Sequence, residues 1–203
     1  MTLSALAVFA AALMVAAGSP GPSIAALVAR VLTNGLREVV PFLVAMWIGE
    51  AVWLTLAVAG MAAIAATLGH LFILLRYAGA AYLIYLALRM WNAPLGIDDR
   101  RPPAPQLPWK MFGAGLAVSL GNPKIMVFYL ALLPTIVDIA HVGMIGWAEL
   151  VATMLLVLIA VDLAWALLAA RARRLLSSRR AVRIANRTGA VVMADAAATI
   201  AAN

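Results

Sequence analysis

The stretch Gly18-Ser19-Pro20-Gly21-Pro22 interrupts an apolar run that covers residues 3–29. Pro lacks a backbone N–H and clashes with the preceding helical turn, so two Pro around a flexible Gly are difficult to fit into a continuous helix. A kinked but continuous helix is the alternative, and the second Pro makes it the less favoured one. The sequence therefore predicts a long apolar helix that is broken near its middle.

Five further apolar segments follow, and all six approach the length of a membrane-spanning helix, which is about 20 residues. Hydrophobic residues make up 66% of the 203-residue chain and charged residues only 11%. So few polar side chains cannot cover a surface in water, which excludes a soluble globular enzyme. The last segment is short and contains Asp195, so an interfacial helix is its alternative. The predicted segments are 3–29, 42–65, 71–88, 111–137, 142–170 and 188–202.

The basic residues lie almost entirely in alternate connections between these segments. Of the 15 Lys and Arg residues, all but Arg76 and Lys124 fall in the first, third and fifth connections. Because Lys and Arg are enriched in cytoplasmic loops, we expect a multi-pass protein of the cell (inner) membrane with both termini outside. The Arg-rich run 171–187 is also compatible with a nucleic-acid or anionic-lipid patch, but topology explains it without a nucleic-acid partner. The connections hold Arg30, Arg37, Arg89, Arg100, Arg101, Lys110, Arg171, Arg173, Arg174, Arg179, Arg180, Arg183 and Arg187.

A Pro-rich linker, residues 92–108, separates two halves of three segments each, 1–91 and 109–203. An odd number of segments per half inverts the second half relative to the first, which is a recurring plan of transporters. Both halves have a Pro break in the first segment, then an acid three residues before Trp, then Arg shortly before Gly-Ala. The predicted fold is an all-α integral membrane protein, with six transmembrane helices as two inverted three-helix repeats in one membrane domain. The matching stretches are 18–22 and 121–124, 50–53 and 162–165, and 76–80 and 187–190.

Two acids are predicted to lie inside the membrane, Glu50 in the second segment and Asp162 in the fifth. At 1.5 Å per residue, Glu50 lies about 12 Å and Asp162 about 13 Å from the cytoplasmic ends of their helices. Charged side chains at such depth are costly and usually functional. One interpretation is a structural ion pair with Lys124 or Arg76. The other is that the two acids bind a substrate ammonium group and carry protons.

The helix breaks themselves are the second candidate feature. A break exposes a new helix N-terminus, whose free N–H groups and positive dipole end suit a carboxylate. Lys124 follows the second break and is predicted to be a counter-ion for one of the acids or a partner for a substrate carboxylate. The predicted broken-helix site comprises Pro20, Gly21, Pro22, Asn122, Pro123 and Lys124.

Small residues in the fourth segment predict a helix-packing face. Gly113, Ala117 and Gly121 recur every four positions and therefore lie on one side of a helix. Small side chains allow the backbones of two membrane helices to approach closely. We expect this side to contact a neighbouring helix.

At this point the motifs can be compared with known families. Together they resemble the LysE/RhtB family of amino-acid exporters, the LysE-type translocators, over nearly the whole chain. The resemblance implies export of amino acids from the cytoplasm, driven by the proton-motive force. Two positions depart from the family pattern, because Glu50 stands where Asp is usual and Ser23 where Asn or an acid is frequent. The motifs are Ser19-Pro20-Gly21-Pro22, Gly35-Leu-Arg37, Gly49-Glu50, Gly79-Ala80-Ala81-Tyr82-Leu83 and Asn122-Pro123-Lys124.

Two other classes of function remain as alternatives, a transporter of metal cations and an integral membrane enzyme or redox carrier. Cys is absent, and the only His residues are His70 and His141, which lie far apart in the sequence. Few ligands are therefore available for a metal, and thiol or dithiol chemistry is excluded. We expect no catalytic residues, no cofactor and no metal. The expected partners are an amino-acid substrate, protons and the lipid bilayer, with a homo-oligomer left open.

Overall fold

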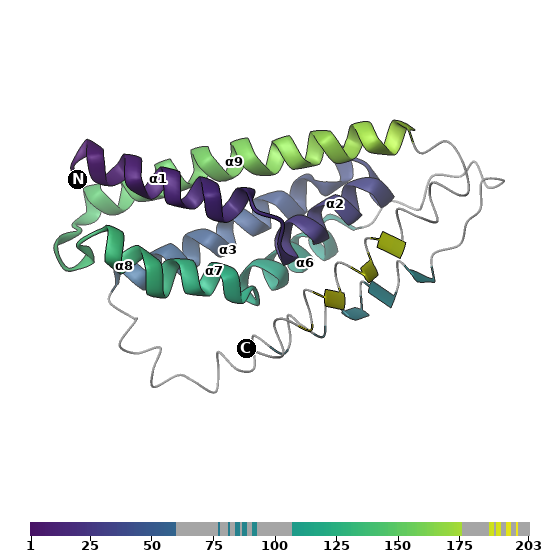
Figure 1. Cartoon of the computed structure of the whole chain (residues 1–203), viewed down its shortest axis with the longest axis horizontal. Coiled ribbons are helices and arrows are strands. Elements are labelled where there is room, and N and C mark those ends of the chain that lie inside the picture. Colours follow the sequence, from purple (N-terminus) through teal and green to yellow (C-terminus); the bar gives the residue numbers. More distant parts are fainter. Residues whose placement is uncertain are drawn as a thin grey trace.

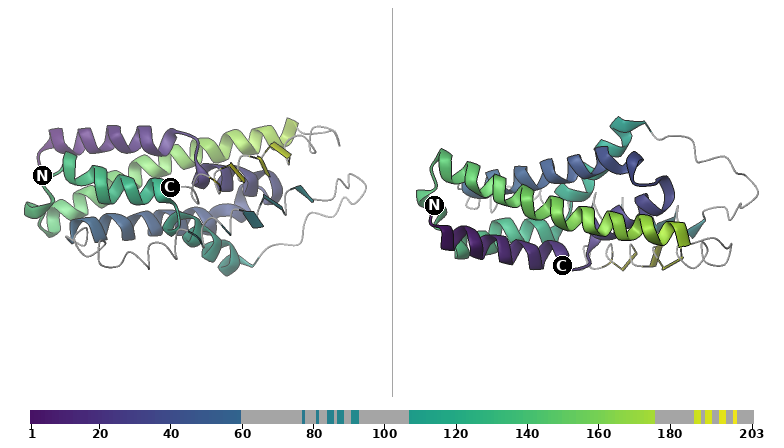
Figure 2. Two further views of the ribbon diagram at one scale, coloured as in Figure 1. Left: turned by 60° about the horizontal axis from the view of Figure 1, so that its bottom comes forward. Right: turned by 90° about the horizontal axis from the view of Figure 1, so that it is seen from above.

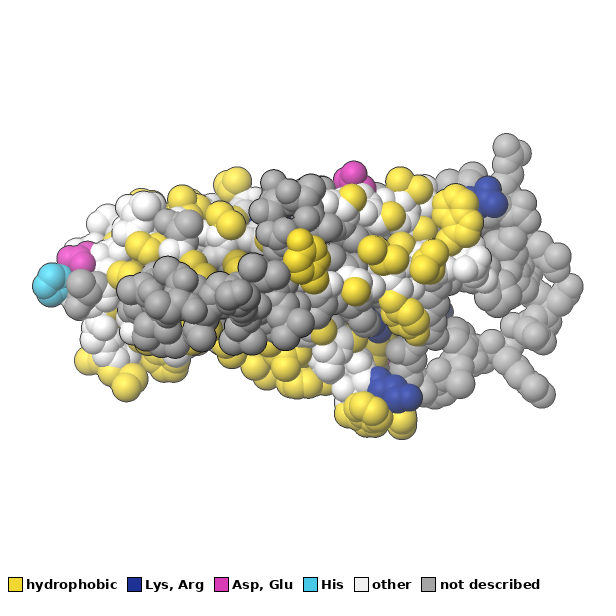
Figure 3. Space-filling model, turned by 90° about the horizontal axis from the view of Figure 1, so that it is seen from below, with side chains coloured by type: hydrophobic (Ala, Val, Ile, Leu, Met, Phe, Trp, Pro, Cys, Tyr) yellow, Lys and Arg dark blue, Asp and Glu magenta, His cyan; other side chains and the backbone are white. Residues whose placement is uncertain are grey.

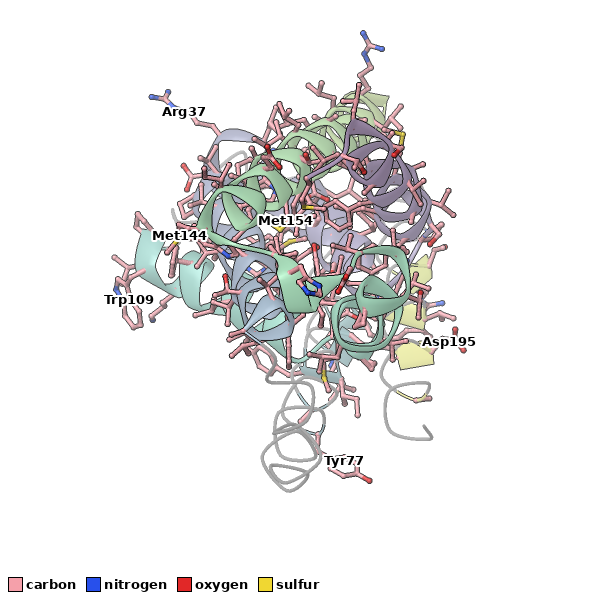
Figure 4. All side chains as sticks on the ribbon, turned by 90° about the vertical axis from the view of Figure 1, so that its left-hand side faces the viewer. Arg37, Tyr77, Trp109, Met144, Met154 and Asp195 are labelled. Carbon is pink, nitrogen blue, oxygen red and sulfur yellow. The ribbon has the colours of Figure 1, made fainter. Side chains whose placement is uncertain are left out.

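The structure, a computed structural model, describes residues 1–59 and 107–175, together with scattered positions between residues 77 and 92 and between 187 and 198. Every regular element in these described parts is a helix, as the composition predicts. The helices lie side by side in an elongated bundle (Figure 1). Met154 lies at the centre of the bundle, whereas Arg37 and Trp109 project outward (Figure 4).

The first predicted segment is a broken pair of helices. α1 (Leu3–Gly18) and α2 (Pro22–Asn34) are bent by 56° relative to each other. Pro22 takes the first turn of α2, where its missing N–H costs no intrahelical hydrogen bond. Gly21, in an extended conformation, occupies the N-cap. The break predicted from the Pro-Gly-Pro sequence is confirmed.

The fourth predicted segment is broken at Asn122-Pro123, and this prediction is also confirmed. Asn122 caps the new helix, because its Oδ1 accepts a hydrogen bond from the Lys124 backbone N–H at 3.0 Å. The bend at the break is 51°. The elements of this segment are α6 (Pro108–Leu120), α7 (Pro123–Val127), the π-helix η2 (Phe128–Leu132) and α8 (Leu133–Ile136).

Arg30 lies inside α2 rather than in the connection after it, so its predicted loop position is wrong. Its side chain is buried, with the guanidinium 4.8 Å from the ring centroid of Phe42 and Nη1 donating to Sδ of Met111 at 2.9 Å. α2 continues beyond residue 29 to Asn34 because Gly35, with a φ of 89°, is the first residue that stops it. A glycine in the left-handed region therefore sets the end of α2, whereas the charge of Arg30 does not end the helix.

Among the described residues, two helical stretches are long and apolar enough to cross a membrane alone. Arg37–Val58 includes α3 (Val40–Val58), and Met144–Arg173 covers α9 (Met144–Leu175) except for its last residues. The number rises to four if each bent pair is counted as one span. The third and sixth predicted segments, 71–88 and 188–202, lie mostly outside the described residues. Their described positions are helical. Six spans in two inverted repeats therefore remain a prediction.

Close packing between α3 and α6 uses a different side of α6 from the one predicted. Gly113 and Ala117 are exposed, and Gly115 instead lies against the backbone of α3. A Cβ on Gly49 would fall 2.7 Å from Oγ of Ser119, so this approach requires a glycine. The spacing of small residues identifies α6 as a packing helix but not the side that packs, because small residues lie on both sides.

The ends of the described helices gather at the two ends of the bundle (Figure 2). One end holds the turn between α2 and α3 with η1 (Arg37–Val39), the start of α6, and the end of α9. The other end holds the N-terminus and η3 (Ile139–His141). The Lys and Arg side chains visible in Figure 3 lie in one half of the molecule, and a His side chain lies at the opposite end. We call the end that holds η1, the start of α6 and the end of α9 the basic end.

The buried core consists of two apolar clusters along the bundle. The cluster nearer the N-terminus includes Phe9, Trp53 and Leu150. The cluster nearer the basic end includes Leu27 and Phe42. Both helix breaks lie between these clusters, and so do the carboxylates described next.

Candidate functional site

The two helix breaks lie against each other. Nδ2 of Asn122 donates a hydrogen bond to Oγ of Ser23 at 2.7 Å. Nζ of Lys124 donates to the carbonyl oxygen of Ser19 at 2.9 Å and to its Oγ at 2.6 Å. Side chains of the second break therefore bind the residues on either side of the first break.

Both predicted membrane acids lie beside the two helix breaks. Glu50 of α3 is 6% exposed and Asp162 of α9 is 2% exposed. The hydroxyl of Tyr129 donates to Oε2 of Glu50 at 3.0 Å, and Nε1 of Trp47 donates to Oδ2 of Asp162 at 2.9 Å. Each carboxylate is thus held by one neutral donor, which leaves further acceptor capacity on its oxygens.

Among the described residues, Lys124 forms no direct ion pair with Glu50 or Asp162, although all three line one pocket. Ion pairs between described residues occur at Met1–Glu149 and at Asp138–His141, both near the end opposite the basic end. Lys124 binds Ser19 instead. The other suggested partner, Arg76, lies outside the described residues.

Tyr129, which contacts Glu50, lies in a π-helix. The element η2 follows the short α7 directly, and its wider turn shifts the residues after it around the helix axis relative to a regular helix. Tyr129 is fully buried, and its ring packs edge-on against Phe128 with centroids 5.1 Å apart. Such π-turns are frequent at functional sites.

A small pocket joins the two breaks to the two acids. Its volume is about 40 Å³, which is room for a few water molecules at most. Five of the predicted site residues line it, and Pro20, Pro22 and Pro123 do not, because they act on the backbone around it. Its wall is otherwise largely apolar, with contributions from Leu13, Ile24 and Phe128. The lining residues predicted from the sequence are Gly21, Glu50, Asn122, Lys124 and Asp162.

Four polar neighbours of this pocket are not predicted as site residues from the sequence, namely Ser19, Ser23, Trp47 and Tyr129. Ser19 and Ser23 flank the Pro-Gly-Pro motif, so proximity to the break was the available signal. Trp47 precedes Glu50 by three residues, which places both on one helix face. No comparable signal existed for Tyr129, because its contact with Glu50 depends on which helices are neighbours.

The pocket combines a cation, two carboxylates and an apolar wall. Two carboxylates in a small buried space repel each other when both are ionised, so a bound proton or ammonium group stabilises the pair. The N-terminus of α2 and the Lys124 ammonium favour a carboxylate on the other side. Among the described residues, no group of three or more His, Cys, Asp and Glu side chains is placed to hold a metal ion.

Broken helices that meet at buried charges, in a bundle whose described elements are helices and include candidate membrane spans, are typical of transporters. The model of the family described as LysE type translocator matches residues 13–203. The chain belongs to this family, as its motifs predict, and it is a membrane translocator rather than an enzyme.

Several curated proteins are similar to the chain. An uncharacterized membrane protein of Synechocystis sp. is 27% identical over 182 residues, which cover 90% of this chain and 88% of that protein. The chemotactic transduction protein ChpE of Pseudomonas aeruginosa is 37% identical over 136 residues, or 63% of this chain and 64% of ChpE. A leucine efflux protein of Salmonella typhimurium is 31% identical over 127 residues, or 61% of this chain and 60% of that protein. No solved structure matches the chain.

Proposed function

We propose that the protein exports an amino acid with an apolar side chain from the cytoplasm, in exchange for protons. The observation that carries this proposal is that Lys124, Glu50 and Asp162 line one pocket where two helix breaks meet. An amino acid is a zwitterion, so it needs an anionic site and a cationic site a few ångströms apart. The similarity to a leucine efflux protein supports an aliphatic substrate.

In this proposal each charge of the substrate has its own partner. The ammonium group binds between Glu50 and Asp162. The carboxylate binds Lys124, which exchanges its hydrogen bonds to Ser19 for the substrate, and the free N–H groups at the start of α2. The apolar side chain lies against Leu13, Ile24 and Phe128 in the pocket wall.

Proton coupling follows from competition for the same carboxylates. Protons that enter from the outside neutralise Glu50 and Asp162 and release the ammonium group outward. Loss of those protons to the cytoplasm restores the anionic site, which then binds the next substrate molecule. An exchange of this kind uses the inward proton gradient to drive outward transport against a substrate gradient.

The cycle also requires the pocket to open to each side in turn. At about 40 Å³ the pocket is too small for an amino acid, and an apolar core cluster lies between it and each end of the bundle. Transport through the described conformation therefore requires the pocket to widen. The two breaks are natural hinges, because α1 and α2, like α6 and α7, are joined by short non-helical backbone.

We place the basic end in the cytoplasm and both termini outside, in the cell (inner) membrane. Arg37, Lys110 and the arginines at the end of α9 lie at the basic end, and cytoplasmic loops are enriched in such residues. Reporter fusions at Ser178 and after Asn203 test this orientation. A cytoplasmic C-terminus would contradict both the orientation and the inverted repeat.

Transport by purified protein in liposomes tests the function. Vesicles preloaded with labelled leucine and given an inward proton gradient should lose the label faster than vesicles without protein. Glu50→Gln or Asp162→Asn should abolish the gradient-driven export while leaving leucine–leucine exchange. Glu149→Gln, the same change at a carboxylate that pairs with the N-terminal amino group, should leave export intact. Normal gradient-driven export by both pocket variants would refute the coupling role of these acids.

A further inference from the structure

A second hollow lies at the basic end, away from the substrate pocket. It is a surface groove of about 860 Å³ between the turn that follows α2 and the last turns of α9. Leu36 lines it from the turn, and Leu167, Leu168, Arg171 and Arg173 line it from α9. Figures 1 and 2 show the end of α9 running beside α2 at this place.

The wall of the groove on α9 is a single helix face. Ala164, Leu167, Leu168 and Arg171 follow the spacing i, i+3, i+4, i+7, which places them in one stripe. All four are exposed, and Leu167 and Leu168 are 53% and 58% exposed. In a membrane protein such a stripe faces acyl chains, and it ends here on a guanidinium group.

Two arginines stand at the end of this stripe. Nη2 of Arg173 donates to the carbonyl oxygen of Thr33 at 3.4 Å, which holds the guanidinium beside the C-terminus of α2. Arg171 is exposed and has no acidic partner among the described residues. The groove therefore offers two positive charges next to an apolar surface, and Thr33 holds one of them in place.

The position along the bundle corresponds to the level of lipid headgroups. Trp109, at the start of α6 at the same end, is 67% exposed and lies 5.5 Å from Nζ of Lys110. Exposed Trp beside basic residues marks the interface between membrane and water. The apolar part of the groove thus lies below the headgroups and the arginines lie among them.

We propose that this groove binds an anionic phospholipid. Its phosphate lies between Arg171 and Arg173, and an acyl chain lies along Leu167 and Leu168. Arg binds phosphate with paired, charge-assisted hydrogen bonds, and basic pockets between membrane helices suit anionic headgroups. The volume and the apolar wall favour a lipid over a free phosphate ion, which would use only the two arginines. A lipid bound here connects α2, the second half of the first broken helix, to α9.

Native mass spectrometry of the purified protein with phosphatidylglycerol or phosphatidylcholine tests the proposal. The wild-type protein should retain phosphatidylglycerol in preference to phosphatidylcholine. Arg171→Gln combined with Arg173→Gln should weaken retention of phosphatidylglycerol about thirtyfold. Arg37→Gln, an exposed arginine at the same end but outside the groove lining, should leave it unchanged. A thermal unfolding temperature in phosphatidylcholine equal to that of the wild-type protein verifies that the double variant is folded. Arg171→Gln alone should show an intermediate loss of phosphatidylglycerol retention.

Two further experiments distinguish a bound lipid from a free phosphate ion and from a second copy of the chain. Ala164→Trp, which fills the groove but keeps both arginines, should also weaken lipid retention, and inorganic phosphate should not compete. Equal retention of both lipids, equal loss in Arg37→Gln, or displacement by inorganic phosphate would overturn the proposal. A purified dimer that Ala164→Trp dissociates would also overturn it, because the groove would then be an interface between two copies of the chain.

Discussion

The two helix breaks occupy matching places in the two halves of the chain, yet they contribute different groups to the pocket. At the first break, residues 19–21 separate α1 from α2, and the motif contributes backbone and the hydroxyl groups of Ser19 and Ser23. At the second break, Asn122 and Lys124 extend across to the first. The first break therefore provides space and acceptors, and the second provides donors and the cation. Matching motifs in the two halves of a sequence do not imply matching roles.

The largest effect is expected from repairing the first break. Pro20→Ala combined with Pro22→Ala restores two N–H groups and favours continuous helix, which removes the space around Gly21. Export should fall about tenfold or more, because small displacements of a binding site are costly, while the protein still reaches the membrane. The control is Pro41→Ala in the first turn of α3. Unchanged export by the double variant would make the motif an ordinary kink.

An intermediate effect is expected at the second break. Asn122→Ala removes both the helix cap and the contact with Ser23. Loss of the cap should lower the free energy of unfolding by about 1 kcal/mol, and export should fall several-fold. Asn122→Ser keeps a capping oxygen, but its side chain is too short to reach Ser23. This variant should therefore keep the free energy of unfolding of the wild-type protein and still show the several-fold fall in export. Equal thermal unfolding of the Ala and Ser variants would argue against the capping role.

Local chemistry explains which features the sequence alone predicts. A Pro removes a helical hydrogen-bond donor whatever its neighbours are, so both breaks could be predicted from Pro20, Pro22 and Pro123. The depth of Glu50 and Asp162 follows from counting residues along a helix, and both line one pocket. These features need no knowledge of which helices are neighbours.

Features that depend on neighbouring helices could not be predicted. Gly115, and not Gly113, faces α3. The spacing of small residues indicates which residues share one side of a helix, but it does not indicate which side a neighbouring helix covers. Arg30 was assigned to a loop because its charge suggested exposure, whereas a thioether and an aromatic ring surround it inside α2. Lys124 was paired with an acid by charge, whereas the geometry of the breaks gives it Ser19.

The smallest effect is expected at the π-turn that follows only the second break. Tyr129→Phe removes the hydrogen bond to Glu50 but keeps the ring in place. One hydrogen bond contributes about 1 kcal/mol, so export should fall by about fivefold. If Tyr129→Phe exports as fast as the unaltered protein, the contact between Tyr129 and Glu50 plays no part in transport.

The division of labour between the breaks and the acids is tested most directly by binding measurements on purified protein with ligands that lack one charge. Lys124→Met should weaken the binding of leucine about tenfold but leave the binding of leucinamide, which has no carboxylate, unchanged. Glu50→Gln combined with Asp162→Asn should weaken the binding of leucine but not of 4-methylpentanoate, which has no ammonium group. Each variant should thus lose affinity only for ligands that carry the charge its residue binds. Equal losses for the complete and the truncated ligand in both variants would contradict a substrate site at the meeting point of the two breaks.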